Sequence, residues 1–480
     1  MSVVMKNIKA SLLLIFILPC FSGCAVFQGL FDFSSSKEPP TSTQTGTKVN
    51  RPVPNQKQGT HIFSQIYKTP ESYEQAYTYR TDVPESKIRM LLRDTQIDAL
   101  RVSNPKGYVL KIIEEINKIA KNDFEKIKMI HDVVALLVLY DAKSYWQGTA
   151  PRQDWQTVLA AKVAVCEGYS NLFKYMCDVA SVPCEKVSGY ARGVGSNIED
   201  EELPNNSNHA WNIVKINNAW YMIDCTWDAG YMEGRIAKQK YTTDYLFLKP
   251  EHMIYTHFPS DSRKQLLLKT ISAHHFYNLP EVKPKFFDAC KMQELPSKKM
   301  FVKNSLHLPY SLNGGFELSF RLTNSASKAV QKNCIFVQND GDSSHCIFSF
   351  PQKGIYLVDV FWSKTNARGG SGCMQFIVEA EEASAVKYPQ VYSVTAKNVK
   401  LISPIEMPLK AGEPIVFSVY VENRKFVAVI YGRNFIPLQS QGDGFFTGEI
   451  TIPTGVKQVS LSFSQSERGS YQTFAQFSVE

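Results

Sequence analysis

Apolar residues recur every three or four positions through much of the first half of the chain, which is the spacing of an amphipathic helix. The clearest case begins at Asp123, which we expect to cap the helix N-terminus. Its apolar face consists of Ile127, Ile130, Val134 and Leu137. The helices expected on this basis span 84–100 in short pieces, 107–120, 123–140 and 167–180.

Strands with alternating apolar and polar residues follow the last of these helices. We expect one strand over 184–192 and two more over 209–216 and 219–227. Asn217 and Asn218 separate the last two, and asparagine tolerates the positive φ that a two-residue hairpin turn requires. Helices followed by a hairpin indicate an α+β domain.

After residue 285 the pattern changes to short alternating strands separated by turn residues. The stretches 291–382 and 383–480 each have the length of an immunoglobulin-like β-sandwich. They lack the Cys, Trp, Cys spacing of antibody domains, so this comparison extends to architecture alone. We therefore expect an α+β domain with an N-terminal helical extension over 61–290, followed by two all-β sandwiches.

The N-terminus has the pattern of an export signal. Lys6 and Lys9 form a short basic region, and the apolar core over 12–18 is too short to span a bilayer as a helix. Phe-Ser-Gly then precedes Cys24, which resembles a bacterial lipoprotein signal in which that cysteine receives lipid. Residues 1–23 are accordingly expected to be a removable signal peptide. An ordinary secretory signal and an uncleaved anchor are the alternatives.

Residues 24–60 are rich in Ser, Thr and Pro and poor in apolar side chains, which predicts a flexible tether. With a lipid on Cys24, this tether would hold the folded part at a membrane of the cell envelope, facing the periplasm or the exterior. The whole chain has a net charge of +8, but its Lys and Arg residues are scattered. The absence of a dense basic helix argues against nucleic-acid binding.

Cysteine and histidine spacings do not indicate a metal site. The ten cysteines contain no CxxC pair, which argues against zinc. Export of the chain would permit disulfides, and a bridge between Cys334 and Cys346 is one alternative that the sequence leaves undecided. His131 is expected on the polar side of its helix. HExxH or comparable ligand spacing is also lacking in the remaining group of histidines, namely His252, His257, His274 and His275.

Three residues in separate segments are of the types that thiol catalysis needs: Cys166, His209 and Asp224. Cys166 precedes the helix expected over 167–180, so unpaired N–H groups and the positive end of the helix dipole would face its sulfur. A histidine that takes the thiol proton creates the nucleophilic thiolate. The N–H of Cys166 would stabilise an oxyanion. Singly, each residue also has a structural explanation: a buried small side chain, a core histidine and a surface carboxylate.

The expected hairpin makes a geometric prediction about this set. If Asn217 and Asn218 form the turn, paired residues have numbers that sum to 435, and Trp211 lies opposite Asp224. His209 and Asp224 then share a face of the sheet as diagonal neighbours, with Cα atoms roughly 7 Å apart. A slip of one residue would place them on opposite faces.

The segments around these residues resemble motifs of the transglutaminase-like superfamily, whose members share a papain-like site. The segments are Val165–Ser170, His209–Asn212 and Asp224–Trp227, with Tyr140–Asp141 before them. Two later segments, Asp244–Pro250 and Thr256–Asp261, resemble those of kyphoscoliosis-peptidase-type proteins, which often append immunoglobulin-like domains.

The resemblance implies a papain-like core in which Cys166 is the nucleophile, His209 the base and Asp224 the residue that orients the base. Ala164 stands where glycine is common, and we expect it to crowd the approach to Cys166 slightly.

We therefore expect an exported, lipid-anchored cysteine enzyme that acts on amide bonds of protein or peptide substrates through an acyl-enzyme. The resemblance favours a peptidase, and neither a metal nor a cofactor is expected. One alternative is a protein-crosslinking transglutaminase, in which an amine replaces water as the acyl acceptor. The other is a catalytically silent adhesion or scaffold protein whose immunoglobulin-like domains bind a protein partner.

Overall fold

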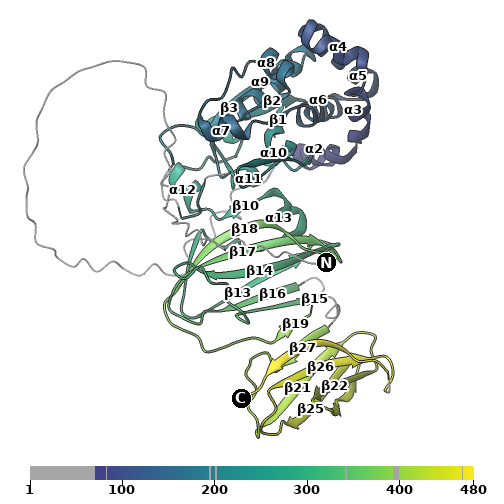
Figure 1. The fold of residues 1–480 in the computed structure, drawn as a ribbon, viewed down its shortest axis with the longest axis vertical. Coiled ribbons are helices and arrows are strands. Elements are labelled where there is room, and N and C mark those ends of the chain that lie inside the picture. Colours follow the sequence, from purple (N-terminus) through teal and green to yellow (C-terminus); the bar gives the residue numbers. More distant parts are fainter. Residues whose placement is uncertain are drawn as a thin grey trace, which may run out of the picture.

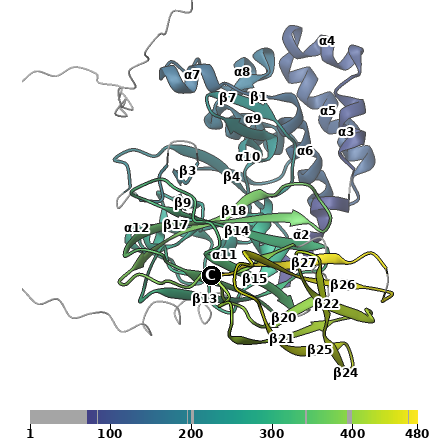
Figure 2. The same ribbon diagram turned by 60° about the horizontal axis from the view of Figure 1, so that its bottom comes forward.

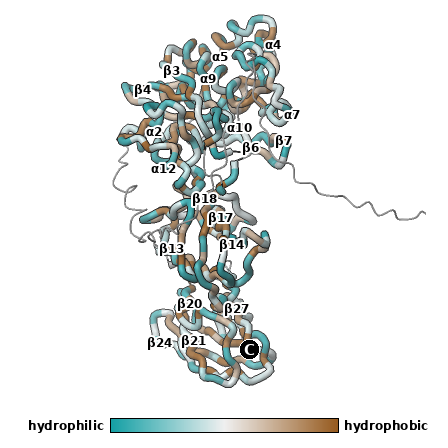
Figure 3. Tube along the Cα trace, turned by 90° about the vertical axis from the view of Figure 1, so that its left-hand side faces the viewer, coloured by the Kyte–Doolittle hydropathy of each residue, from teal (hydrophilic) through white to brown (hydrophobic). Residues whose placement is uncertain are grey.

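The computed structural model describes residues 71–480 apart from 83, 194–195, 200–202, 341–342, 393–398 and 468. The expected signal peptide (1–23), the lipidated Cys24 and the expected tether (24–60) lie outside the described residues. The described chain forms three parts in sequence order: helices around a sheet, then two β-sandwiches (Figure 1). Figure 3 shows the same succession from the side. An α+β core followed by two all-β sandwiches is the expected fold class, which is confirmed.

The helices of the first part pack in layers onto its sheet. α9 packs on the two central strands, α6 packs on α9, and α5 packs on both helices. The helices are α2 (Glu71–Asp82), α3 (Glu85–Leu91), α4 (Thr95–Ser103), α5 (Pro105–Ile119), α6 (Asp123–Leu137), α7 (Ala142–Gln147), α8 (Trp155–Ala161) and α9 (Cys166–Val179).

Helix α6 differs from its prediction at both ends. Asn122 is its N-cap and accepts the Glu125 N–H at 3.0 Å, so the expectation that Asp123 caps the helix was wrong. The helix also stops at Leu137, because the next residues form β1 (Leu139–Tyr140), which pairs in parallel with β2 (Val163–Ala164). A long-range strand pair therefore ends a helix that the apolar run alone would continue.

The sheet of the first part has the strand order β8-β5-β4-β3-β9. Its central hairpin has the expected register, with Ile216 opposite Ala219 and Asn212 opposite Ile223. Asn217 and Asn218 adopt φ values of 48° and 66°, as a two-residue turn requires. The strands are β3 (Cys184–Ala191), β4 (His209–Ile216), β5 (Ala219–Ile223), β8 (Leu246–Leu248) and β9 (His257–Pro259).

The second hairpin strand is shorter than expected. It ends at Ile223 rather than 227, and helix α10 (Cys225–Ala229) follows. Asp224 causes this change, because its Oδ1 accepts the N–H groups of Thr226 at 2.8 Å and Trp227 at 3.2 Å. These bonds cap a helix, and the two N–H groups that they use are no longer available for pairing with a neighbouring strand.

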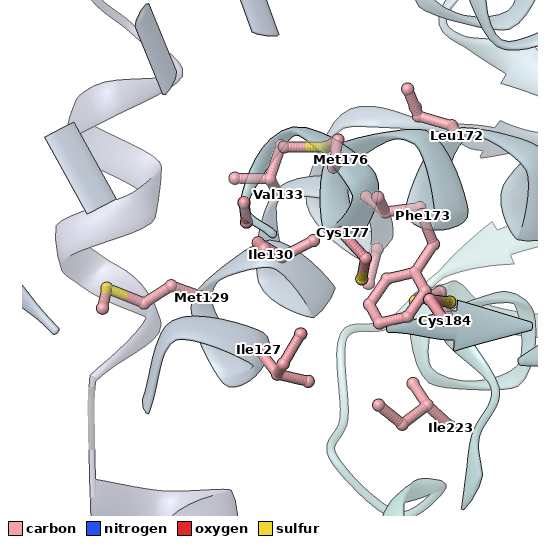
Figure 4. Close-up of a cluster of buried hydrophobic side chains, with 14 of the residues drawn as sticks. Ile127, Met129, Ile130, Val133, Leu172, Phe173, Met176, Cys177, Cys184 and Ile223 are labelled. Carbon is pink, nitrogen blue, oxygen red and sulfur yellow. The ribbon is translucent and has the colours of Figure 1, made fainter. Parts of the chain in front are cut away.

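A dense apolar core holds α6 and α9 against the sheet. In Figure 4 the ring of Phe173, from α9, lies beside Cys184 of β3, and Ile223 of β5 lies below them. All three side chains are buried, and Phe173 is 0% exposed. Fully burying a side chain of this size contributes about 1.5–3 kcal/mol. This core fixes the height of α9, and so of Cys166, above the hairpin.

The first sandwich packs one sheet on another around a separate core. Alternation of exposed and buried residues along β13 shows how one face enters that core. One sheet contains β10 (Glu281–Val282), β12 (Lys299–Val302), β14 (Phe316–Asn324), β17 (Gly354–Lys364) and β18 (Ser371–Ala380). The other contains β11 (Cys290–Lys291), β13 (Ser305–Leu312), β15 (Ile335–Asp340) and β16 (Ser343–Ser349).

Residues of the helical part contribute to the apolar core of the first sandwich. Ile254, Tyr255 and Phe258 belong to this core, as does Phe286 of helix α13 (Pro284–Ala289). Figures 1 and 2 both show the sheet with β17 and β18 nearer to the helices than the second sandwich is. Strand β9 of the first part (His257–Pro259) therefore contributes Phe258 to the sandwich core, and two more core residues precede the strand.

The second sandwich closes the chain. Its core is built from inward side chains such as Phe417, Val429 and Leu461, which are all 0% exposed. One sheet contains β19 (Gln390–Val391), β22 (Phe426–Tyr431), β23 (Asn434–Pro437), β26 (Gln458–Ser464) and β27 (Gln472–Ser478). The other contains β20 (Val399–Ser403), β21 (Pro414–Val421), β24 (Gln439–Gly442) and β25 (Phe445–Thr451).

Two further observations concern cysteines and membranes. All eight cysteines in the described part of the chain are free thiols, so Cys334 and Cys346 do not form a bridge. Of the helices that the structure describes, none combines the length and apolar character needed to cross a membrane.

Replacing Phe173 by Ala is expected to lower the free energy of unfolding of the helical part by about 3–5 kcal/mol, because it empties a fully buried site. Urea unfolding followed by circular dichroism at 222 nm reports mainly on that part, since both sandwiches consist of strands. The matched control is Leu110→Ala, at a site on α5 that is 59% exposed. Equal losses in the two variants would contradict this account of the core.

Candidate active site

Cys166 is the first residue of α9, where the sequence pattern placed it. The preceding Val165 is extended and offers no side-chain cap, so the helix N-terminus keeps unpaired N–H groups. Among the residues that the structure describes, none accepts a hydrogen bond from the Cys166 N–H. The residue is partly exposed. A partly exposed thiol and an N–H group free to bind an oxygen thus lie together at the start of α9.

The turn before Cys166 is held by close packing around Gly168. A Cβ on this glycine would lie 2.5 Å from Gln153 Oε1 and 2.6 Å from the Ala164 Cβ. The same Gln153 oxygen accepts the Val165 N–H at 3.1 Å. Ala164 is 0% exposed and its methyl group faces Gly168. The expectation that Ala164 crowds the approach to Cys166 was therefore wrong, because its side chain is enclosed inside the turn.

His209 and Asp224 meet as the hairpin register predicts. His209 begins β4, and its Nε2 lies 2.7 Å from Asp224 Oδ2. The other carboxylate oxygen is fixed by the N-terminus of α10. The imidazole also hydrogen-bonds to the Cys166 thiol. Since Nε2 serves Asp224, the bond to sulfur falls to Nδ1. The three residues chosen from the sequence thus form one hydrogen-bonded chain.

The charges of this chain stabilise one another. Burial would raise the pKa of the Cys166 thiol, but the charge of His209 and hydrogen bonds from its ring and from the Ala210 N–H lower it below the usual value. Burial would lower the pKa of His209, whereas the charges of Asp224 and Cys166 raise it to about 10. His209 likewise holds the pKa of Asp224 well below its usual range despite burial. These shifts all favour a thiolate–imidazolium pair beside a carboxylate.

His257 is a fourth member of the cluster that the sequence analysis missed. It begins β9, is 1% exposed, and places Nε2 at 3.1 Å from Asp224 Oδ2. Its pairing with β3 brings it there from 33 residues beyond Asp224. The Thr-His-Phe-Pro segment contributed only to the family resemblance. The other histidines considered with it lie elsewhere: His252 stacks on Phe287, and His274 and His275 are in α12 (Ala273–Asn278).

The same cluster is the place where a metal ion would be sought. His209, Asp224 and His257 bring ligand-type atoms within 4.8 Å of one another. The Nε2 atoms of the two histidines already hydrogen-bond to one oxygen of Asp224, at 2.7 and 3.1 Å. An ion there would have to displace both hydrogen bonds, so the donor set is better suited to holding the carboxylate than to holding a cation.

A second polar cluster connects α10 to α6. His131 is 0% exposed, which contradicts the expectation that it lies on the polar side of its helix. Its Nδ1 lies 3.1 Å from Asp132 Oδ1 and its Nε2 lies 3.1 Å from Asp228 Oδ2. Burial would lower the pKa of His131, but the two carboxylates raise it. This cluster ties α6 to α10, and Asp224 is the cap of α10.

A groove of about 880 Å³ runs from this site to the first sandwich. Asn208, His209 and Trp227 line it on the helical part, and Trp362 and Ser371 line it on the sandwich. Positive side chains outnumber negative ones along it. The charged lining consists of Arg192, Lys238, Lys240, Lys283 and Lys285 with Asp244 and Glu281.

Residues 111–225 match the family model of the transglutaminase-like superfamily. Mouse kyphoscoliosis peptidase is 27% identical over 192 residues, which are 40% of this chain and 29% of the mouse protein. Hillarin from Drosophila melanogaster is 29% identical over 133 residues, 25% of this chain and 16% of that protein. The crystal structure of a TGase is 19% identical, covers 35% of this chain and 39% of that one, and gives a TM-score of 0.21.

The matched range ends one residue after Asp224, so it includes all three residues of the hydrogen-bonded chain. The low TM-score adds nothing to the assignment, which rests on the sequence matches. This chain therefore contains a transglutaminase-like domain, and over part of its length it is similar to proteins of the kyphoscoliosis-peptidase type.

Proposed function

We propose that this protein is a thiol acyl-transfer enzyme that hydrolyses amide bonds of protein or peptide substrates. The hydrogen-bonded chain of Cys166, His209 and Asp224 carries the proposal, because a histidine partner lowers the pKa of the thiol and so favours the nucleophilic thiolate. The match to the transglutaminase-like superfamily supports the same class of reaction.

The geometry suggests the following steps. The Cys166 thiolate attacks the carbonyl carbon of the amide, and a C–S bond forms as the carbonyl oxygen becomes an oxyanion. That oxyanion accepts the Cys166 N–H at the start of α9. Protonated His209 then gives its Nδ1 proton to the leaving amine, the C–N bond breaks, and an acyl-thioester remains.

Hydrolysis completes the cycle. His209, now neutral, takes a proton from water, and the hydroxide attacks the thioester carbonyl. The C–S bond breaks, the acid product leaves, and the thiolate–imidazolium pair is restored. Asp224 holds the ring in one tautomer throughout. An amine in place of the water would make the same site a crosslinking enzyme.

The groove supports a polypeptide substrate. It lies between His209 and the first sandwich, which forms its far wall through Trp362 and Ser371. Its surplus of lysines favours segments that carry acidic side chains. In this proposal the first sandwich contributes to substrate binding, and the second sandwich is available to a protein partner.

We also propose that the enzyme is exported and held at a membrane of the cell envelope by a lipid on Cys24. Support comes from the basic, apolar and small-residue pattern that precedes this cysteine. The Ser-, Thr- and Pro-rich stretch after it would then let the active site reach substrates at a distance from the bilayer.

Alkylation of Cys166 by iodoacetamide tests the thiolate. Its rate is expected to reach half-maximum at a pH below the ~8.5 of a free thiol, because His209 stabilises the thiolate. His209→Ala should move the half-maximum upward by a unit or more, so alkylation at pH 6 slows at least roughly tenfold. Mass spectrometry of the Cys166 peptide is the measurement.

The control for this experiment is His274→Ala, which removes an exposed histidine far from the cluster. It should leave the profile unchanged. A wild-type profile with the ordinary thiol midpoint would refute the proposed mechanism.

A bulky side chain at the far wall should hinder large reagents more than small ones. Ser371→Trp is expected to slow the alkylation of Cys166 by a chloroacetyl decapeptide several-fold and to leave the iodoacetamide rate unchanged, because Ser371 lines the groove. Ser440→Trp, at an exposed strand position in the second sandwich, is the matched control. Equal rates in all three proteins would show that the groove does not hold the peptide.

Cys24→Ser should abolish partition of the protein into the detergent phase of Triton X-114, because position 24 then offers no thiol to the lipid. The control is Cys20→Ser, since residue 20 is removed with the expected signal peptide. Detergent partition that persists in Cys24→Ser would contradict the lipid anchor.

A further inference from the structure

His257 shares its acceptor with His209. The two Nε2 atoms lie 3.1 and 2.7 Å from the same Asp224 oxygen, Oδ2. Asp224 Oδ1 receives the N–H groups of Thr226 and Trp227. The carboxylate thus has four N–H partners, as many as its lone pairs can accept. Since Asp224 is 1% exposed, these partners take the place of water.

The tautomer of His257 is set by Asp224. An ionised carboxylate only accepts hydrogen bonds, so the ring proton is on Nε2, where it faces Asp224 Oδ2 at 3.1 Å. His257 Nδ1 is then an acceptor, and Thr256 Oγ1 lies 2.9 Å from it. The Thr256 hydroxyl has a second acceptor, the carbonyl oxygen of Met253 at 3.3 Å. Neither nitrogen of His257 is left to act on a substrate, which distinguishes this residue from His209.

The surroundings keep His257 neutral. The charged or titratable groups around it are Asp224, His209 and Tyr245. The rings of Trp211 and Trp227 lie 5.0 and 4.5 Å from its own, centroid to centroid. Burial lowers the pKa of His257 to about 4, although Asp224 opposes that shift. A neutral imidazole donates one hydrogen bond without competing with His209 for the positive charge.

We propose that His257 is a positioning residue, a permanently neutral N–H donor that keeps Asp224 ionised and aimed at the imidazole of His209. The proposal rests on the thiolate mechanism described above. A buried carboxylate with an unsatisfied lone pair binds a proton more readily. Loss of the donor should therefore weaken the negative charge that stabilises the His209 imidazolium. The Cys166 thiolate then loses its partner, so the pKa of the thiol rises.

The experiment compares three replacements through the pH profile of Cys166 alkylation by iodoacetamide. His257→Leu removes the donor at similar volume and should raise the midpoint by about one unit, a roughly tenfold slower reaction at pH 6. His257→Gln places an amide N–H near the former Nε2 and should restore most of the wild-type profile. Thr256→Val removes the polar partner of the buried His257 Nδ1 and should shift the midpoint in the same direction as His257→Leu, by less.

The matched control is His252→Leu. His252 is also a histidine whose pKa burial lowers, to about 3, but it stacks on Phe287 and does not touch Asp224. It should leave the midpoint in place. A merely structural role for His257 would lower the melting temperature of His257→Leu without moving the midpoint, and that result would overturn the inference. If His257→Leu does not fold, Thr256→Val carries the test, and an unshifted midpoint in that variant would overturn the inference.

The same data separate this inference from the proposed function. A wild-type midpoint at the ordinary thiol value would refute the thiolate mechanism and the role of His257 with it. A lowered wild-type midpoint that His257→Leu leaves unchanged would refute only the role of His257.

Discussion

Asp224 carries a negative charge where almost no solvent reaches it, and four N–H groups compensate that charge. A buried carboxylate is costly unless its lone pairs are satisfied and an opposite charge lies nearby. Both conditions hold here, because the N-terminus of α10 satisfies one oxygen and two imidazoles satisfy the other. The position of His209 above Cys166 depends on this arrangement, since a neutral or displaced Asp224 would release the ring.

Much of the helical part supports that one residue. Asp228 at the other end of α10 accepts hydrogen bonds from Thr242 Oγ1 and the Tyr245 N–H and contacts His131 on α6. α6 packs on α9, so the helix that presents Cys166 and the helix that Asp224 caps share one rigid neighbour. The apolar core shown in Figure 4 then fixes their spacing over the hairpin.

The first sandwich is part of the same construction. Ile254, Tyr255 and Phe258 belong to its core, and they flank His257 on both sides. Packing of the sandwich therefore holds β9 in place, and β9 delivers a donor to Asp224. The groove has one wall on each part, so the same contact surface that supports the site also shapes the space in front of it.

The local features of this site followed from the sequence alone. The Asn217–Asn218 turn fixed the pairing of β4 with β5, and a two-residue period then placed His209 and Asp224 on one face. The start of α9 at Cys166 followed from the apolar spacing behind it. These features depend on hydrogen bonds and side-chain periods within about 20 residues, which a single sequence displays.

Only the tertiary structure decided the rest. The strand ends at Ile223 because the Asp224 side chain accepts the N–H groups of the residues that follow. Helix α6 stops because β1 pairs with β2. His131 is buried because two carboxylates bind its ring nitrogens. His257 reached Asp224 through the pairing of β9 with β3. In each case the deciding partner lies far along the chain or competes with a regular pattern. A polar group needs such a partner only after packing of the chain has removed the water around it.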